Sequence, residues 1–125
     1  LEHIEDDRGE LDAAQRHLRP GGHLIVIAPA HQWLFSEFDT AVGHFRRYSR
    51  GSLQAVIPTD MDRVMLRYMD ALGVALSGAN RLLLRSSAPT PAQIRTWDGF
   101  VVPISRLVDP LLFWSLGESV TGVWC

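Results

Sequence analysis

The segment Leu24-Ile25-Val26-Ile27-Ala28 is the feature that most constrains the fold of this chain. Its apolar residues run without alternation, whereas a strand with one solvated face alternates apolar and polar residues. The run therefore predicts a strand buried on both faces, as in the centre of a parallel sheet. Such a strand needs hydrogen-bonding neighbours on both sides. Few further strands are indicated in the chain, so we expect the missing neighbours to precede Leu1.

Local signals predict helices and strands around this run. Asp6 and Asp7 can cap a helix, which the turn Arg19-Pro20-Gly21-Gly22 ends. Ser49 can cap a second helix that Pro58 closes. A strand is expected over 63–69, where the more buried face carries Val64, Leu66 and Tyr68. A short final strand is expected over 119–125.

Two apolar stripes predict helices between these last two strands. One stripe consists of Leu72, Leu76, Ala79 and Leu83. The other consists of Ile104, Leu107, Val108, Leu111 and Leu112. Pro110 is expected to kink this second helix or to start another one capped by Asp109. Residues 86–91 form a connector rich in Ser and Pro.

Composition excludes several classes of protein. The 125 residues carry a formal charge of −2, which excludes a generally basic nucleic-acid protein. Cys125 is the single cysteine, so neither an internal disulfide framework nor a cysteine-based zinc site is expected. No apolar run reaches the roughly 18 residues of a membrane span. No leader is visible either. We therefore expect no transmembrane segment and a cytoplasmic protein.

A set of ordered motifs carries a family resemblance. They are Leu1-Glu2-His3-Ile4-Glu5-Asp6-Asp7, Leu18-Arg19-Pro20-Gly21-Gly22-His23-Leu24, Pro29-Ala30, Phe38-Asp39 and Gly43-His44-Phe45-Arg46-Arg47-Tyr48. Together they resemble the second half of a class I S-adenosylmethionine-dependent methyltransferase, of the bacterial group that acts on small molecules. The firm resemblance covers residues 1–53.

The resemblance implies an α/β fold: the C-terminal half of a Rossmann-like domain, with a parallel sheet, a final antiparallel strand and a helical insertion. Residues 1–70 would be the α/β part, 71–116 the insertion and 117–125 the last strand. No G-x-G-x-x-G loop occurs in the chain, although the family binds its cofactor with a glycine-rich loop. Most of the S-adenosylmethionine site is therefore expected upstream, and this fragment alone should be inactive.

Two groups of residues are candidates for chemistry. By the family placement, Leu1, Glu2 and His3 would border the cofactor, and His3 would be a catalytic candidate. His44 is the best candidate for a general base, because imidazole titrates near neutral pH. The plainer interpretation is that His3 braces the following helix.

The loop after the apolar run would face a small-molecule acceptor. Arg46 and Arg47 could hold a phosphate or carboxylate, and Tyr48 could position the acceptor. The alternative is that the arginines pair with Asp39 or Glu37 at the surface. Trp33 would line the acceptor pocket, or else anchor the loop to the core.

No metal is expected, since the chain has no H-E-x-x-H motif, no His-x-His pair and no cysteine near its histidines. The apolar helices also allow an oligomer contact or a lipid-linked acceptor, and the sequence leaves the oligomeric state open. One alternative is a non-catalytic α/β module that binds a protein or a membrane surface through these helices. Another is a nucleotide-sugar or NAD enzyme, which the missing phosphate loop disfavours.

Overall fold

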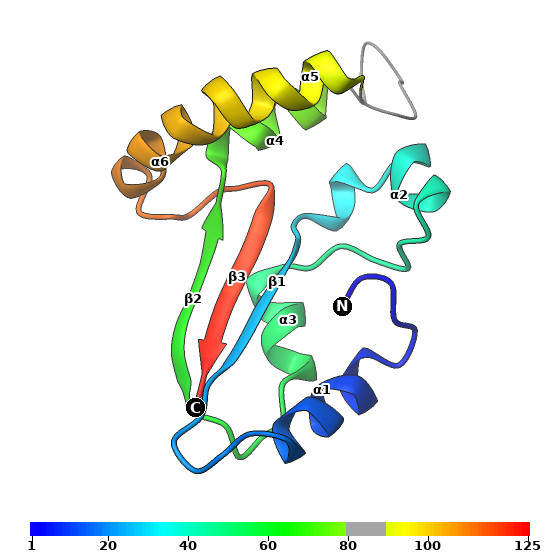
Figure 1. Ribbon diagram of the computed structural model, residues 1–125, viewed down its shortest axis with the longest axis vertical. Coiled ribbons are helices and arrows are strands. Elements are labelled where there is room, and N and C mark those ends of the chain that lie inside the picture. Colours follow the sequence, from blue (N-terminus) through cyan, green and yellow to red (C-terminus); the bar gives the residue numbers. More distant parts are fainter. Residues whose placement is uncertain (80–89) are drawn as a thin grey trace.

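The chain is a mixed α/β protein built on a three-stranded sheet (Figure 1). The computed structural model describes residues 1–79 and 90–125. The strands are β1 (Leu24–Pro29), β2 (Arg63–Met69) and β3 (Ser119–Trp124), in the order β1-β3-β2. Because β3 is antiparallel to both neighbours, β1 and β2 run in the same direction. Their carboxyl ends therefore lie at the same end of the sheet.

The prediction that β1 is a central strand buried on both faces is wrong in this structure. Among the described residues β1 pairs only with β3, and it does so antiparallel. Burial alternates along it, with Val26 buried while Ile25 and Ile27 are 64% and 63% exposed. Among the described elements, helices cover one face of β1, and the side chains on its other face are exposed. The unbroken apolar run therefore does not show that only one face of β1 is covered in this structure.

One face of the sheet carries the core, covered by α1 (Asp7–Arg16) and α3 (Arg50–Val56). The expected caps are confirmed: Asp6 accepts a hydrogen bond from the amide of Gly9, and Ser49 accepts one from the amide of Ser52. The buried cluster joins helix, loop and strand residues, among them Leu11, Leu53, Tyr48, Val120 and Trp124. This burial fixes how the helices lie against the sheet.

The predicted burial of β2 holds only in part. Tyr68 is buried and Leu66 lies against the core, but Val64 is 58% exposed. The pairing of β2 with β3 shifts between Arg63 and Met65, so an extra residue interrupts the register there. A bulge of this kind breaks strict alternation. The final strand is confirmed as β3, which occupies the centre of the sheet.

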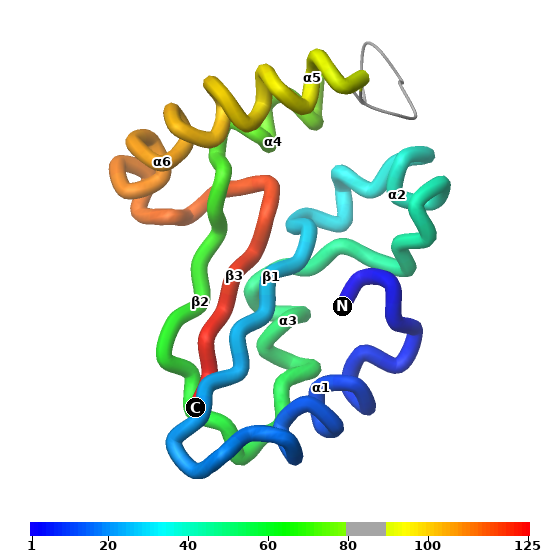
Figure 2. The backbone as a smooth tube through the Cα atoms, viewed as in Figure 1, coloured from blue at the N-terminus to red at the C-terminus, as the bar shows by residue number. Residues whose placement is uncertain are grey.

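The helices between β2 and β3 are α4 (Ala71–Ala79), α5 (Pro91–Thr96), a π-helical turn η3 (Trp97–Val101) and α6 (Val102–Leu111). Figure 2 shows α5, η3 and α6 as one continuous rod beyond the end of β2. Pro110 lies inside α6. The prediction that it starts a second helix capped by Asp109 is therefore wrong. Leu83 and residues 86–89 of the predicted elements lie outside the described residues. Within the described ranges, no helix is long and apolar enough to cross a membrane.

Both apolar stripes face the wrong way for the predicted packing. In α4 the buried residues are Ala71, Gly73 and Val74, while Leu76 is exposed. In α6 the buried residues are Ser105 and Asp109, and the stripe residues Leu107 and Leu111 point outward. A polar contact between the two helices accounts for this orientation: Asp109 of α6 accepts the amides of Asp70 and Ala71 at the start of α4.

Candidate functional site

The candidate site lies just beyond the carboxyl end of β1, where three segments meet. The loop that follows the apolar run, residues 30–48, contains a short 3-10 helix η1 (Gln32–Leu34) and α2 (Glu37–Ala41), and then returns to β1. On return, Tyr48 donates its amide to the carbonyl of Pro29 at 2.8 Å. The amide of Phe45 donates to the carbonyl of Glu2 at 2.7 Å. The backbone thereby brings the first residues of the chain beside His44.

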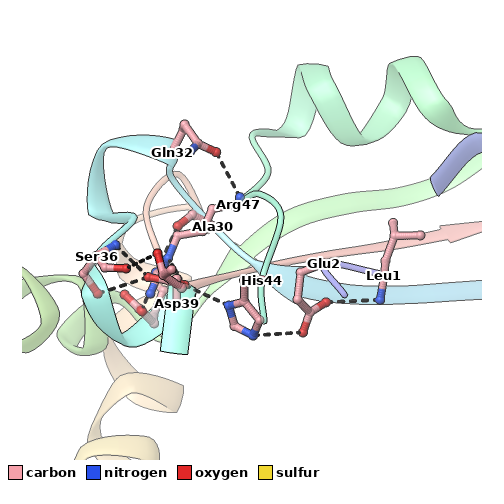
Figure 3. Close-up of polar contacts among 10 residues, drawn as sticks. Leu1, Glu2, Ala30, Gln32, Ser36, Asp39, His44 and Arg47 are labelled. Atoms are coloured by element: carbon pink, nitrogen blue, oxygen red, sulfur yellow. Dashed lines mark hydrogen bonds and ion pairs between the residues drawn. The ribbon is translucent and has the colours of Figure 1, made fainter. Parts of the chain in front are cut away.

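His44 is held by a buried carboxylate (Figure 3). Its Nδ1 lies 2.8 Å from Oδ1 of Asp39, and its Nε2 lies 3.9 Å from Oε1 of Glu2. An ionised carboxylate can only accept hydrogen bonds, so Nδ1 carries the proton in this contact. Neutral His44 then has its lone pair on Nε2, on the side of Glu2. This is the arrangement of an oriented imidazole base.

Asp39 is the anchor of this arrangement, and it is fully buried. Its carboxylate also accepts the amide of Ser36 at 2.9 Å, which caps α2, and Nε of Arg47 at 2.9 Å. Burial alone would raise the pKa of Asp39, but the hydrogen bonds from Arg47 and His44 outweigh it and hold the pKa below its ordinary value. Asp39 therefore stays ionised and fixes His44.

Glu2 and His3 complete a compact cluster with His44. The rings of His3 and His44 meet edge to face, with centroids 4.6 Å apart. One ligand atom from each of the three residues lies within 4.8 Å of the others. The cluster thus combines one carboxylate with two imidazoles.

Three of the four remaining loop candidates are joined to the chain's own polar groups. Arg47 is buried, and its Nη1 donates to Glu118 at 2.8 Å besides the Nε contact to Asp39. The hydroxyl of Tyr48 donates to Asp7 at 2.8 Å, and Nη1 of Arg46 lies 2.6 Å from the same carboxylate. The pairing of Arg47 with Asp39 was the alternative considered above, although the pair is buried rather than at the surface. These contacts hold the loop against the sheet.

Trp33 differs, because its side chain is 57% exposed in η1. The interpretation that Trp33 anchors the loop to the core is therefore wrong. Trp33 remains a candidate for lining an acceptor site. Beside it, the ring of His31 stacks on Tyr68 with centroids 4.6 Å apart. His31 has φ = 64° and a buried Nε2 without a hydrogen-bond partner in the described structure.

Sequence reasoning missed Asp39 as the partner of His44, and it missed the grouping of His44 with Glu2 and His3. The five-residue interval from Asp39 to His44 belongs to no motif with a known geometry. Gly43 between them adopts φ = 82°, a left-handed conformation that favours glycine and turns the chain back toward Glu2. A glycine directly before a histidine was the available signal.

Comparison with known proteins adds no relative: no family model, curated protein or solved structure matches this chain.

Proposed function

We propose that this chain forms the acceptor side of an S-adenosylmethionine-dependent methyltransferase, with His44 as the residue that takes the proton from the methyl acceptor. The observation that carries the proposal is the contact of His44 with buried Asp39, which directs Nε2 toward Glu2. The motifs quoted in the sequence analysis supply the reaction class. The geometry supplies the role of the imidazole.

The sheet supports the proposal through its strand directions. The family implies parallel strands with a final antiparallel strand, and here β3, the last strand, is antiparallel to β1 and β2, which run alike. Open α/β sheets bind ligands beyond the carboxyl ends of their strands. The cluster of Glu2, His3 and His44 lies beyond that end of β1, beside the carbonyl of Pro29 and the returning loop.

The first residues of the chain fit one edge of the cofactor. Its sulfonium is a cation, and the carboxylate of Glu2 offers a complementary charge. The side chain of Leu1 is 5% exposed and packs against the core, so Leu1 fixes the backbone beneath Glu2 and His3. When bound, S-adenosylmethionine supplies an electrophilic methyl group.

The chain's own residues then act on the acceptor. Nε2 of His44 would accept the proton of an acceptor O–H or N–H group as that atom takes the methyl carbon, whose bond to the sulfonium sulfur breaks and leaves a neutral thioether. Asp39 keeps the ring in the required tautomer and stabilises the imidazolium that results. Trp33 offers an exposed aromatic wall in the same loop. Arg46, Arg47 and Tyr48 hold the loop in place through Asp7, Asp39 and Glu118.

The test uses the protein expressed from its complete reading frame. His44→Ala should lower methyl transfer from labelled S-adenosylmethionine to a small-molecule extract by about 10²- to 10⁴-fold, as expected for loss of a general base. Cofactor affinity, measured by calorimetry, should not change. The matched control is His23→Ala, an exposed histidine before the start of β1. Unchanged turnover removes His44 from the mechanism, and absence of cofactor binding refutes the methyltransferase assignment.

A second candidate function follows from α6. Leu107, Leu111 and Phe113 are 73%, 77% and 85% exposed, and large exposed apolar patches mark interaction surfaces. We infer as the alternative a non-catalytic module that binds a protein or a membrane surface through this helix. Leu107→Glu combined with Leu111→Glu should then abolish self-association in sedimentation or binding to lipid vesicles. If neither is seen in the unsubstituted chain, this alternative is rejected.

A further inference from the structure

We propose that Glu2, His3 and His44 form a binding site for a divalent first-row transition-metal ion of the Zn²⁺ type. The inference departs from the expectation of no metal, and it does not rest on methyl transfer. It rests on two imidazoles and one carboxylate, and the fold brings His44 beside the consecutive residues Glu2 and His3, which lie far from it in the sequence. Mixed nitrogen and oxygen donors of this kind suit Zn²⁺, Co²⁺ and Fe²⁺.

The distances are compatible with a shared ion after small side-chain movements. Two donor atoms on one tetrahedral Zn²⁺ lie about 3.3 Å apart, because each bond is about 2.0–2.1 Å long. Oε1 of Glu2 and Nε2 of His44 are 3.9 Å apart, and all three ligand atoms lie within 4.8 Å of one another. His3 is exposed, and its ring already meets that of His44 edge to face. An ideal Cβ at Gly43 would lie 3.9 Å from Nδ1 of His3, so a glycine at this position keeps the space beside that ring open.

Asp39 supplies the outer contact that metal-bound histidines have. A ligating histidine almost always donates its other ring N–H to a carboxylate or carbonyl, which fixes the tautomer and strengthens the donor nitrogen. Asp39 holds Nδ1 of His44 at 2.8 Å, so Nε2 is the free donor on the side of Glu2.

Three protein donors leave at least one coordination position open for water or a substrate oxygen. The same lone pair on Nε2 of His44 cannot hold an ion and take a proton together. An ion in this cluster would therefore exclude the proton-accepting role proposed above for as long as it stays bound. Metal binding is measured without turnover. Its result therefore tests the metal site independently of the methyltransferase proposal.

The experiment is a titration of the full chain with Zn²⁺ by calorimetry, repeated with Co²⁺ to record its visible absorption. We expect one equivalent to bind, with the absorption typical of mixed nitrogen and oxygen ligands. His3→Ala and Glu2→Gln should each weaken binding at least about tenfold, since each removes a ligand. Asp39→Asn should weaken it about 10- to 100-fold. Circular dichroism confirms that each variant is folded.

The control variant is His23→Ala, which removes an exposed histidine outside the cluster and should leave affinity unchanged. Because an N-terminal amine with histidine at position 3 can chelate square-planar Cu²⁺ or Ni²⁺, these ions are not used as probes. The chain is also titrated with a Gly-Ser extension before Leu1, which should retain binding. The proposal is overturned if Zn²⁺ does not bind, if the extension abolishes binding, or if His3→Ala and His23→Ala bind equally.

Discussion

Helices α3 and α6 are attached to the rest of the molecule by opposite kinds of contact, apolar in α3 and polar in α6. α3 buries apolar side chains: Leu53 is fully buried, and Ile57 at its end is 2% exposed. α6 buries Ser105 and Asp109 and leaves Leu107 and Leu111 largely exposed. The first helix is held by removal of apolar surface from water, and the second by hydrogen bonds.

The polar contact of α6 explains its orientation. Asp109 accepts the amides of Asp70 and Ala71, both at 2.8 Å, at the start of α4. The hydroxyl of Ser105 donates to Asp70 at 2.5 Å, and the indole of Trp97 donates to the same carboxylate at 3.1 Å. The bonds to Asp109 satisfy free amides at a helix start, and the bonds to Asp70 tie η3 and α6 to the same point. An apolar stripe therefore predicts a helix without showing which face is buried.

The largest expected effect concerns the apolar contact of α3. Leu53→Ala should lower the free energy of unfolding by about 2–5 kcal/mol, because it removes buried methyl groups and leaves a cavity. Urea unfolding followed by circular dichroism measures the change. The matched control in α6, Leu107→Ala, should change it by no more than about 0.5 kcal/mol. Equal losses in the two variants would show that α6 is packed through its apolar face after all.

A smaller effect is expected for the polar contact of α6. Asp109→Asn should lower the free energy of unfolding by about 1–3 kcal/mol, because an amide group cannot accept both backbone N–H groups as the carboxylate does. The amides of Asp70 and Ala71 should also exchange hydrogen faster. Asp98→Asn, at an exposed aspartate of η3, is the control and should alter neither measurement. Unchanged exchange in Asp109→Asn would argue against the contact.

The smallest effect is a pH dependence on the α1 side. Burial would raise the pKa of Asp7, but hydrogen bonds from Tyr48 and Arg46 outweigh it, so the folded pKa lies below the ordinary 3.8. The stability that Asp7 contributes is present above its unfolded pKa and is lost as the pH falls through the folded one. Between about pH 6 and about pH 3, Asp7→Asn should therefore lose less free energy of unfolding than the unsubstituted chain. Parallel pH curves would contradict this assignment.

Local signals were the part of the fold that sequence could predict. The caps at Asp6 and Ser49 depend on contacts three residues away, and both are present. Burial of β1 depends on segments far along the chain, and there the prediction failed. At the candidate site, the sequence indicates His3 and His44 as two separate catalytic candidates. Their meeting with Glu2 follows from the backbone contact between Phe45 and Glu2, which no local spacing encodes.

The central place of β3 has a consequence for how the chain acquires its structure. Within residues 1–79 and 90–125, β1 and β2 are not paired with each other, and each pairs with β3, residues 119–124. During synthesis both strands leave the ribosome before that partner exists, with their backbone groups open to other chains. Pairings across such long sequence separations also close slowly. The sheet can therefore form only after β3 has been synthesised. A chain that terminates before Ser119 should aggregate.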